Sequence, residues 1–344
     1  MKKTTIGIDL GDRKHAVCVL NEAGTVVEER TVVNDRNSIR EWIYRYKGAT
    51  VAMETGTHSP WVSRLLEDLG FRVYVANARK LRAISSSNTK SDKEDARMLA
   101  RLCRADVELL SPVKHRSERC QRDLVKVKVR DALVRTRVNQ MNSVRFLMKS
   151  LGMKMPSGCK ATSFVKKVRA ELAAEYLELV TPLLEMLEVI EVKIKEVDKE
   201  LERMATERYP ETAILQQVPG VGPLTALSFV LILESPERFA KARDVGPYLG
   251  LSPRRDQSGE TDKQLRITKA GNAQLRCLLV NCSHYILGPF GPPSDLRESG
   301  ERIYQRGAGI AKKKAVIAVA RKLAVTLLAL WKSGDAYCPI KEAA

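Results

Sequence analysis

The first hundred residues contain a regular succession of apolar segments, which constrains the fold more than any other feature of the chain. Three segments with the composition of buried strands come first, and helix-like and strand-like segments then alternate. Strands are expected at residues 4–10, 15–20, 25–33, 50–53 and 72–75, and helices at 38–46, 60–69 and 91–104. This succession predicts an α/β domain in which helices cover a sheet.

Three strands followed by such an alternation are typical of a ribonuclease-H-like (RuvC-like) fold, which we expect for residues 1–110. The chain has 344 residues, enough for further domains. We expect basic linker helices and a coiled coil at residues 111–210, and a mainly α-helical domain at residues 211–344.

Acidic side chains stand where buried strands of the first domain end. Asp9 follows an apolar strand and Glu54 closes another, while Asp92 and Asp95 are three residues apart and therefore share one face of a helix. Singly, each has a structural explanation, such as a turn or a favourable position near a helix N-terminus. Together they predict a catalytic site with an oxygen-only ligand set, which suits Mg²⁺ and phosphoryl transfer.

The charge of the chain is strongly basic and unevenly distributed. Lysine and arginine number 59 against 41 acidic residues, a net charge of +18, and residues 111–170 contribute 16 basic and 3 acidic groups to these totals. Such a balance favours a polyanionic partner, nucleic acid above all. Candidate backbone contacts are Arg122, Lys126, Arg130 and Arg137.

Two segments have a helical stripe of apolar residues, one inside this basic block and one after it. Apolar residues recur at helical spacing over 116–149 and 172–204, which indicates a coiled-coil pair or a long helical hairpin with a surface for self-association. The alternative is a solvated helix bundle that touches no nucleic acid.

The last third of the chain has two polar features. Gly220 and Gly222, between helical segments, predict a helix-hairpin-helix-like element whose backbone N–H groups approach a phosphate. The alternative is a tight interhelical turn without a ligand. A polar loop over 248–260 leads to a second basic segment. Its candidate DNA or RNA contacts are Arg254, Arg255, Arg266 and Lys269.

Cysteine usage and hydropathy exclude several classes of protein. The seven cysteines include no C-x-x-C pair, so neither a disulfide framework nor a zinc site is expected. No signal peptide or membrane span is evident, and we expect a soluble, cytoplasmic protein without a membrane partner.

Taken together, these motifs resemble the DEDD family of insertion-sequence transposases, along nearly the whole chain. The matching segments are Ile8-Asp9-Leu10-Gly11, Met53-Glu54-Thr55-Gly56, Ser91-Asp92 with Asp95-Ala96, Pro219-Gly220-Val221-Gly222, Leu249-Gly250-Leu251-Ser252-Pro253-Arg254, Ser258-Gly259, Ile267-Thr268-Lys269-Ala270-Gly271 and Ala320-Arg321-Lys322-Leu323.

The resemblance implies a transposase domain at 211–344 and a recombinase that acts through a covalent serine–DNA intermediate. Ser258 matches the nucleophile, and Asp9, Glu54, Asp92 and Asp95 match the Mg²⁺-binding quartet. It also implies a structured guide RNA encoded beside the gene, and a homo-oligomer, dimer or tetramer, in which quartet and serine come from different subunits. Gln257 and Glu260 replace a serine and a glycine of many relatives, and Ser252 is the fallback nucleophile.

Two other functions remain open from the residues themselves. A metal-only Holliday-junction-type nuclease needs the quartet but no serine. An actin-like ATPase also has a Gly-x-Asp-x-Gly strand, but the chain lacks a second glycine-rich phosphate loop, and the basic segments would then have no role.

Overall fold

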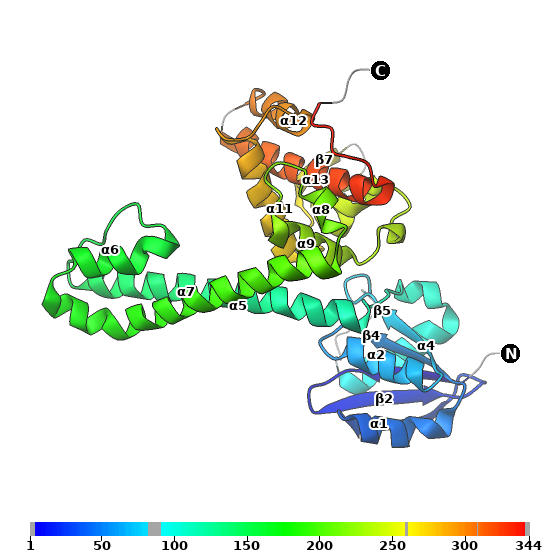
Figure 1. Cartoon of the computed structure of the whole chain (residues 1–344). Coiled ribbons are helices and arrows are strands. Elements are labelled where there is room, and N and C mark those ends of the chain that lie inside the picture. Colours follow the sequence, from blue (N-terminus) through cyan, green and yellow to red (C-terminus); the bar gives the residue numbers. More distant parts are fainter. Residues whose placement is uncertain (1–3, 82–90, 259–260, 308, 341–344) are drawn as a thin grey trace. The chain divides into compact units, whose positions relative to one another are not determined.

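The computed structural model describes residues 4–81, 91–258, 261–307 and 309–340. Residue contacts divide the chain into two compact units, Met1–Ser117 and Glu118–Ala344 (Figure 1). The further boundary expected near residue 210 stays a prediction. Among the residues so described, no helix has the length and apolar character needed to cross a membrane.

The first unit is built on a five-stranded mixed sheet with the order β3-β2-β1-β4-β5. The strands are β1 (Thr5–Asp9), β2 (Lys14–Leu20), β3 (Val26–Val33), β4 (Thr50–Glu54) and β5 (Arg72–Ala76). The first three pair antiparallel through short turns, whereas β4 lies parallel to β1 and β5 parallel to β4. The sheet therefore brings the carboxyl ends of β1, β4 and β5 to one edge.

Helices cover both faces of this sheet. Side chains alternate between faces along a strand, so Ile6 and Ile8 of β1 join the apolar cluster that contains residues of α1 (Arg36–Ile43) and α2 (Ser59–Asp68). The opposite face packs against α4 (Asp92–Ala105), which begins at its N-cap Ser91. Short 3₁₀ turns follow α1 at Tyr44–Tyr46 and α4 at Val107–Leu110.

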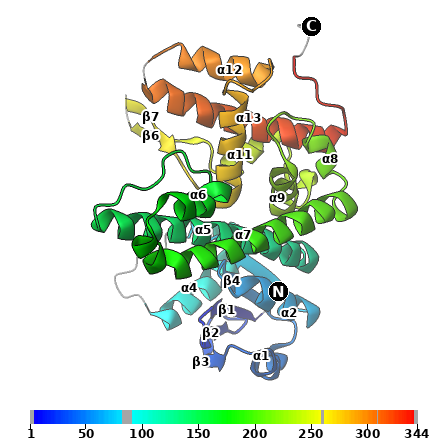
Figure 2. The ribbon, with the colours of Figure 1, turned by 60° about the vertical axis from the view of Figure 1, so that its left-hand side comes forward.

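The second unit begins with a long helical hairpin, α5 (Glu118–Ser150) and α7 (Ala174–Arg208) (Figure 1, Figure 2). A short helix, α6 (Phe164–Glu171), packs across the far end of the pair, where Phe164 and Val168 are buried with residues of both long helices. At the near end, the buried Asp123 accepts hydrogen bonds from Arg208 at 3.1 Å and from the Tyr209 hydroxyl at 2.8 Å. The helical hairpin is thus fixed at both ends.

The remainder of this unit is mostly helical and surrounds the apolar helix α9 (Pro223–Leu233), which is buried along most of its length. The other helices are α8 (Thr212–Leu215), α10 (Val245–Tyr248), α11 (Ala273–Ile286), α12 (Asp295–Tyr304) and α13 (Gly309–Ser333), with 3₁₀ turns at Pro236–Arg238 and Ala242–Asp244. A further 3₁₀ turn, Ala161–Ser163, directly precedes α6. A two-stranded antiparallel hairpin, β6 (Pro253–Ser258) and β7 (Thr261–Ile267), connects α10 to α11.

Candidate functional site

Asp9 and Glu54 occupy equivalent positions on neighbouring parallel strands. The register of β1 and β4 pairs Ile8 with Met53, and the two acids are the next residues of each strand. Parallel neighbours are about 4.8 Å apart across a sheet, so the two carboxylates start from adjacent points of one edge. Both side chains are half-buried.

The alternation of side chains sets the face on which these acids lie. Ile8 and Met53 belong to the cluster with α1 and α2, so Asp9 and Glu54, one residue further, project toward the side of α4. Gly7, two residues before Asp9, faces the same side. A Cβ atom at Gly7 would lie 2.0 Å from the carbonyl oxygen of Ala96, and this glycine therefore lets α4 touch the backbone of β1.

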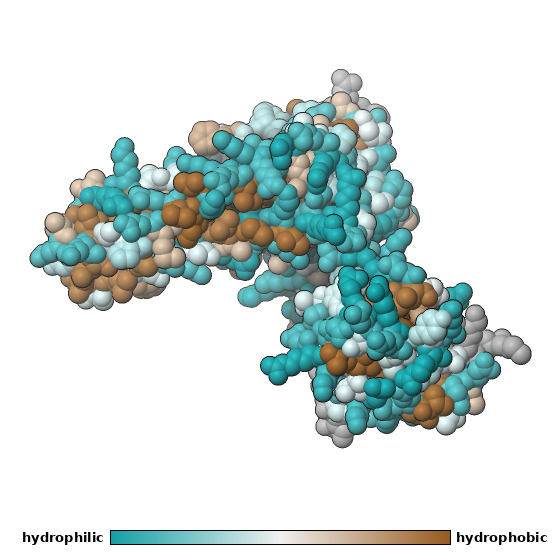
Figure 3. Space-filling view, turned by 60° about the horizontal axis from the view of Figure 1, so that its bottom comes forward, coloured by the Kyte–Doolittle hydropathy of each residue, from teal (hydrophilic) through white to brown (hydrophobic). Residues whose placement is uncertain are grey.

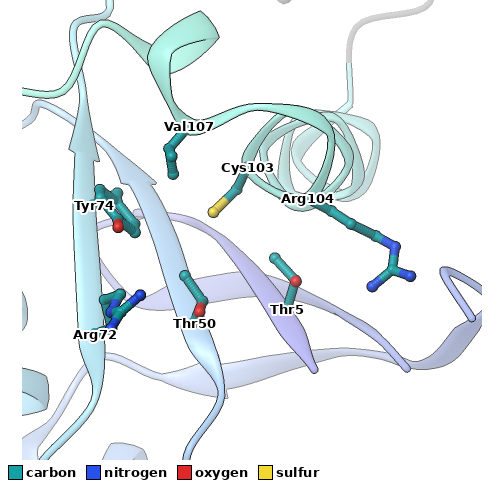
Figure 4. A pocket seen from close by; sticks show the side chains of 7 residues that line it. All are labelled: Thr5, Thr50, Arg72, Tyr74, Cys103, Arg104 and Val107. Atoms are coloured by element: carbon teal, nitrogen blue, oxygen red, sulfur yellow. The ribbon is translucent and has the colours of Figure 1, made fainter. Parts of the chain in front are cut away.

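The direction of α4 places its two acids at the same edge. Its C-terminal residues Cys103 and Arg104 line a hollow of about 170 Å³ with Thr5 and Thr50, which start their strands (Figure 4). The helix therefore runs opposite to β1, and its first turn lies toward the strand ends. Asp92 and Asp95 precede Ala96 and Leu99 by one turn, on the helix face that packs against the sheet.

The four predicted ligands thus lie at one end of the first unit, but they do not form a close cluster. Nowhere in residues 4–81, 91–258, 261–307 and 309–340 do three or more His, Cys, Asp or Glu side chains approach closely enough to hold a metal. Asp95 is half-buried and Asp92 is exposed. The donor set, all carboxylate oxygen, has the chemistry that Mg²⁺ prefers.

A polar group that the sequence did not predict lies beside this edge and is formed by Asp12, Asn34, His58 and Trp61. His58 Nε2 lies 3.0 Å from Asp12 Oδ1, and the indole N–H of Trp61 donates to His58 Nδ1 at 3.2 Å. Asp12, Asn34 and His58 lie in the loops that follow β1, β3 and β4, and this position after a strand is the one feature of the sequence that could have identified them. Their meeting depends on contacts up to 46 residues apart in the sequence, which no local pattern contains.

Ser258 is the last residue of β6, where its backbone pairs with Thr261 beside the turn. Its side chain, like Gly259 and Glu260, lies outside the described part of the structure. The base of this hairpin is held by close backbone contacts: a Cβ atom would meet Ala270 N at 2.2 Å if placed on Gly250, and Tyr248 O at 2.2 Å if placed on Gly271.

The basic residues of this hairpin are open to solvent. Arg254, Arg255, Arg266 and Lys269 are exposed, and the ion pairs found among the described residues include none of them.

The four basic residues predicted on α5 are instead ion-paired. Their partners are Glu118 for Arg122, Glu200 for Lys126, Asp198 for Arg130 and Glu191 for Arg137. Three of these acids belong to α7. The Arg137 and Glu191 side chains are only 17% and 19% exposed, and their closest atoms are 2.7 Å apart. Much of the positive charge of α5 is thus matched inside the helical hairpin.

Gly220 and Gly222 lie between α8 and α9. Gly220 has a φ of +87°, which favours glycine, and Gly222 is the N-cap of α9 with open space at its Cβ position. Because α8 has a single turn, the first helix of the predicted helix-hairpin-helix-like element is very short.

Two family models match the chain. Residues 6–153 match a DEDD model of the IS110 group described as Transposase, and residues 212–292 match the Transposase IS116/IS110/IS902 family.

Full-length relatives agree with these matches. The chain is 29% identical to the transposase for insertion sequence element IS1328 of Yersinia enterocolitica, over 81% of this chain and 83% of the relative. It is 26% identical to the transposase for IS1111A of Coxiella burnetii, over 96% and 90%. It is also 25% identical, over 94% of both chains, to the pilin gene-inverting protein of Moraxella bovis. The chain therefore belongs to the IS110/IS116 family of DEDD-type insertion-sequence transposases, enzymes that cleave and rejoin DNA.

Proposed function

We propose that this transposase has a ribonuclease-H-like N-terminal domain with a Mg²⁺ site formed by Asp9, Glu54, Asp92 and Asp95. The observation that carries the proposal is the matched register of Asp9 and Glu54 on β1 and β4, on the sheet face toward α4. The strand order β3-β2-β1-β4-β5 is compatible with that fold. Bound Mg²⁺ would stabilise negative charge on the phosphate oxygens during strand transfer.

In this proposal the nucleophile is the hydroxyl of Ser258. Its Oγ forms a bond to phosphorus while the bond from phosphorus to a deoxyribose oxygen breaks, and the serine proton passes to a base. Rejoining reverses the step, because a deoxyribose hydroxyl attacks the serine phosphodiester. The exposed arginines of the β6–β7 hairpin would hold the phosphate backbone nearby.

A covalent-trapping experiment tests the serine. We expect Ser258→Ala to abolish the protein–DNA adduct seen by denaturing gel, and Ser252→Ala to keep it. Ser252 is the matched control because it directly precedes β6, whereas Ser258 ends it. An adduct from Ser258→Ala would refute the assignment, and hydrolysed ends without any adduct from the unaltered protein would identify a metal-only nuclease.

Two partner assignments belong to the same proposal: a structured guide RNA and a second copy of the chain. The α5–α7 hairpin exposes apolar surface (Figure 3), which is suited to self-association. Its exposed apolar residues include Val125, Val129, Phe146 and Leu147 of α5, and Leu179, Met186, Val189 and Val192 of α7. Light scattering of the protein with and without ribonuclease treatment tests both assignments, because loss of an RNA and loss of a subunit change the mass differently.

A further inference from the structure

Two loops carry the chain away from the strand ends that hold Asp9 and Glu54. The first is the turn at residues 10–13, and the second runs from Thr55 to His58, immediately before α2. The separation of the two carboxylates depends on how these loops are held, because each acid is the last residue of its strand.

Each loop is held by a side chain that lies outside it. The Asn34 side chain donates to the carbonyl oxygens of Gly11 at 3.1 Å and Asp12 at 2.9 Å. In the second loop, the Ser59 hydroxyl accepts from Gly56 N at 3.0 Å and donates to Gly56 O at 2.9 Å. Each loop therefore behaves as a short rigid piece.

His58 joins the two pieces. The indole N–H of Trp61 can only donate, so His58 Nδ1 accepts this bond, and the ring proton sits on Nε2, which donates to Asp12 Oδ1. Asn34 Nδ2 lies 3.4 Å from the same ring. The imidazole thereby bridges the loop after Asp9 to the helix that follows Glu54.

This bridge contributes little to the stability of the fold. The Asp12 side chain is 94% exposed, and exposed pairs of this kind are worth less than about 1 kcal/mol. A bond that adds little stability still fixes a distance, and groups that orient metal ligands indirectly have large effects on metal affinity.

We infer that His58 is a positioning residue, an inference that rests on the metal site of the proposed function. Through its Nε2–H bond to Asp12, His58 sets the separation of Asp9 and Glu54 for a divalent cation. The cation does not touch His58. Loss of the bond leaves the fold intact and weakens cation binding.

Binding of Mn²⁺ to the full chain, measured by electron paramagnetic resonance, tests this role. We expect His58→Phe, which keeps the ring and removes both nitrogens, to raise the Mn²⁺ dissociation constant about tenfold with an unchanged thermal midpoint. His58→Gln retains an N–H at the Nε2 position and should restore binding to within about threefold. Equal binding by His58→Phe and the unaltered chain overturns the inference, and so does equal weakening by the Phe and Gln variants.

Asp12 supplies the matched half of the test. Asp12→Ala should weaken binding as much as His58→Phe, and the double variant should be no weaker than either single one. Asp12→Asn keeps the acceptor oxygen without the charge and should bind Mn²⁺ nearly normally. If Asp12→Asn weakens Mn²⁺ binding as much as Asp12→Ala does, the charge of Asp12 alone matters and the inference is overturned. Asp9→Ala separates the two proposals: if it also leaves Mn²⁺ binding unchanged, the proposed metal site itself has failed.

Discussion

Helix α5 and the β6–β7 hairpin are both rich in arginine and lysine, but their surroundings differ. On α5, Lys126, Arg130 and Arg137 each meet an acid of α7. On the β-hairpin, Arg255 and Arg266 are exposed and belong to none of the ion pairs among the residues that the structure covers. A count of charges alone therefore does not show which basic residues pair with a neighbouring helix and which are exposed to solvent.

The attachment of the β-hairpin gives the largest expected effect. Gly250→Ala places a Cβ atom 2.2 Å from Ala270 N at a φ of +69°, so the backbone crossing must open. We expect the free energy of unfolding of the second unit to fall by about 4 kcal/mol, measured by urea denaturation. Gly309→Ala, where the added Cβ meets nothing within 4 Å, is the control and should change it by less than about 1 kcal/mol. A similar loss in both variants would contradict the close-contact explanation.

The next effect concerns the near end of the helical hairpin. Asp123→Ala leaves Arg208 and the Tyr209 hydroxyl without their buried acceptor, and we expect a loss of about 3 kcal/mol in the same urea measurement. The matched exposed pair is Glu118 with Arg122, and Glu118→Ala should cost less than about 0.5 kcal/mol. If both substitutions lower the free energy of unfolding equally, burial of Asp123 does not make its bonds to Arg208 and Tyr209 more stabilising than an exposed ion pair.

Nucleic-acid affinity tests the comparison itself. The double variant Arg255→Gln with Arg266→Gln should lower the slope of log affinity against log salt by about 2, because two phosphate contacts are lost, and should leave stability unchanged. Fluorescence anisotropy with labelled duplex DNA over a salt series measures the slope.

The counterpart on α5 should behave in the opposite way. Arg130→Gln with Arg137→Gln should cost about 2 kcal/mol of stability, because two partly buried acids lose their partners, while the salt slope stays the same. A reduced slope in this variant would show that the α5 cations leave α7 to bind nucleic acid.

The smallest effect concerns His115, a half-buried histidine whose protonation the folded chain disfavours. Burial, and then the nearby Arg64 and Arg116, lower the pKa of His115, so the folded chain resists its protonation. The unfolded chain takes up the proton near pH 6.5, and stability is therefore full above that pH and declines as the pH falls toward the folded pKa, by at most about 1.4 kcal/mol per pH unit. Thermal unfolding of the first unit between pH 7.5 and about 5 measures this. His115→Asn should reduce the pH dependence but not remove it, because burial also lowers the pKa of His15 in the same unit.

The strands and helices of the first unit were largely predictable because their signals are local. The alternation in Ile6-Gly7-Ile8-Asp9 and the Ser91 cap each act within a few residues, and the structure confirms the strand and the cap there. The same locality explains why both strand-end acids could be found from the sequence. Their joint use as metal ligands stays a prediction.

Features that depend on distant partners were not predictable. The apolar repeat expected over 172–204 includes Leu179, but Leu179 is 63% exposed and the next residue, Val180, is buried instead. The packing of α5 and α6 against α7 decides which of the two turns inward. The pairing of the α5 cations with α7 and the bridge at His58 likewise depend on residues far apart in the sequence. The sequence shows that these groups are present, but it does not show which distant residues each of them contacts.

The α5–α7 hairpin has a consequence for how such chains can diverge. Its two helices leave and rejoin the rest of the second unit at one end, while the connection with α6 lies at the other. Whole turns could therefore be inserted or removed in step from both helices without altering anything at the near end. The length of the α5–α7 hairpin can therefore change, by mutation or by design, without a change in the residues proposed for catalysis.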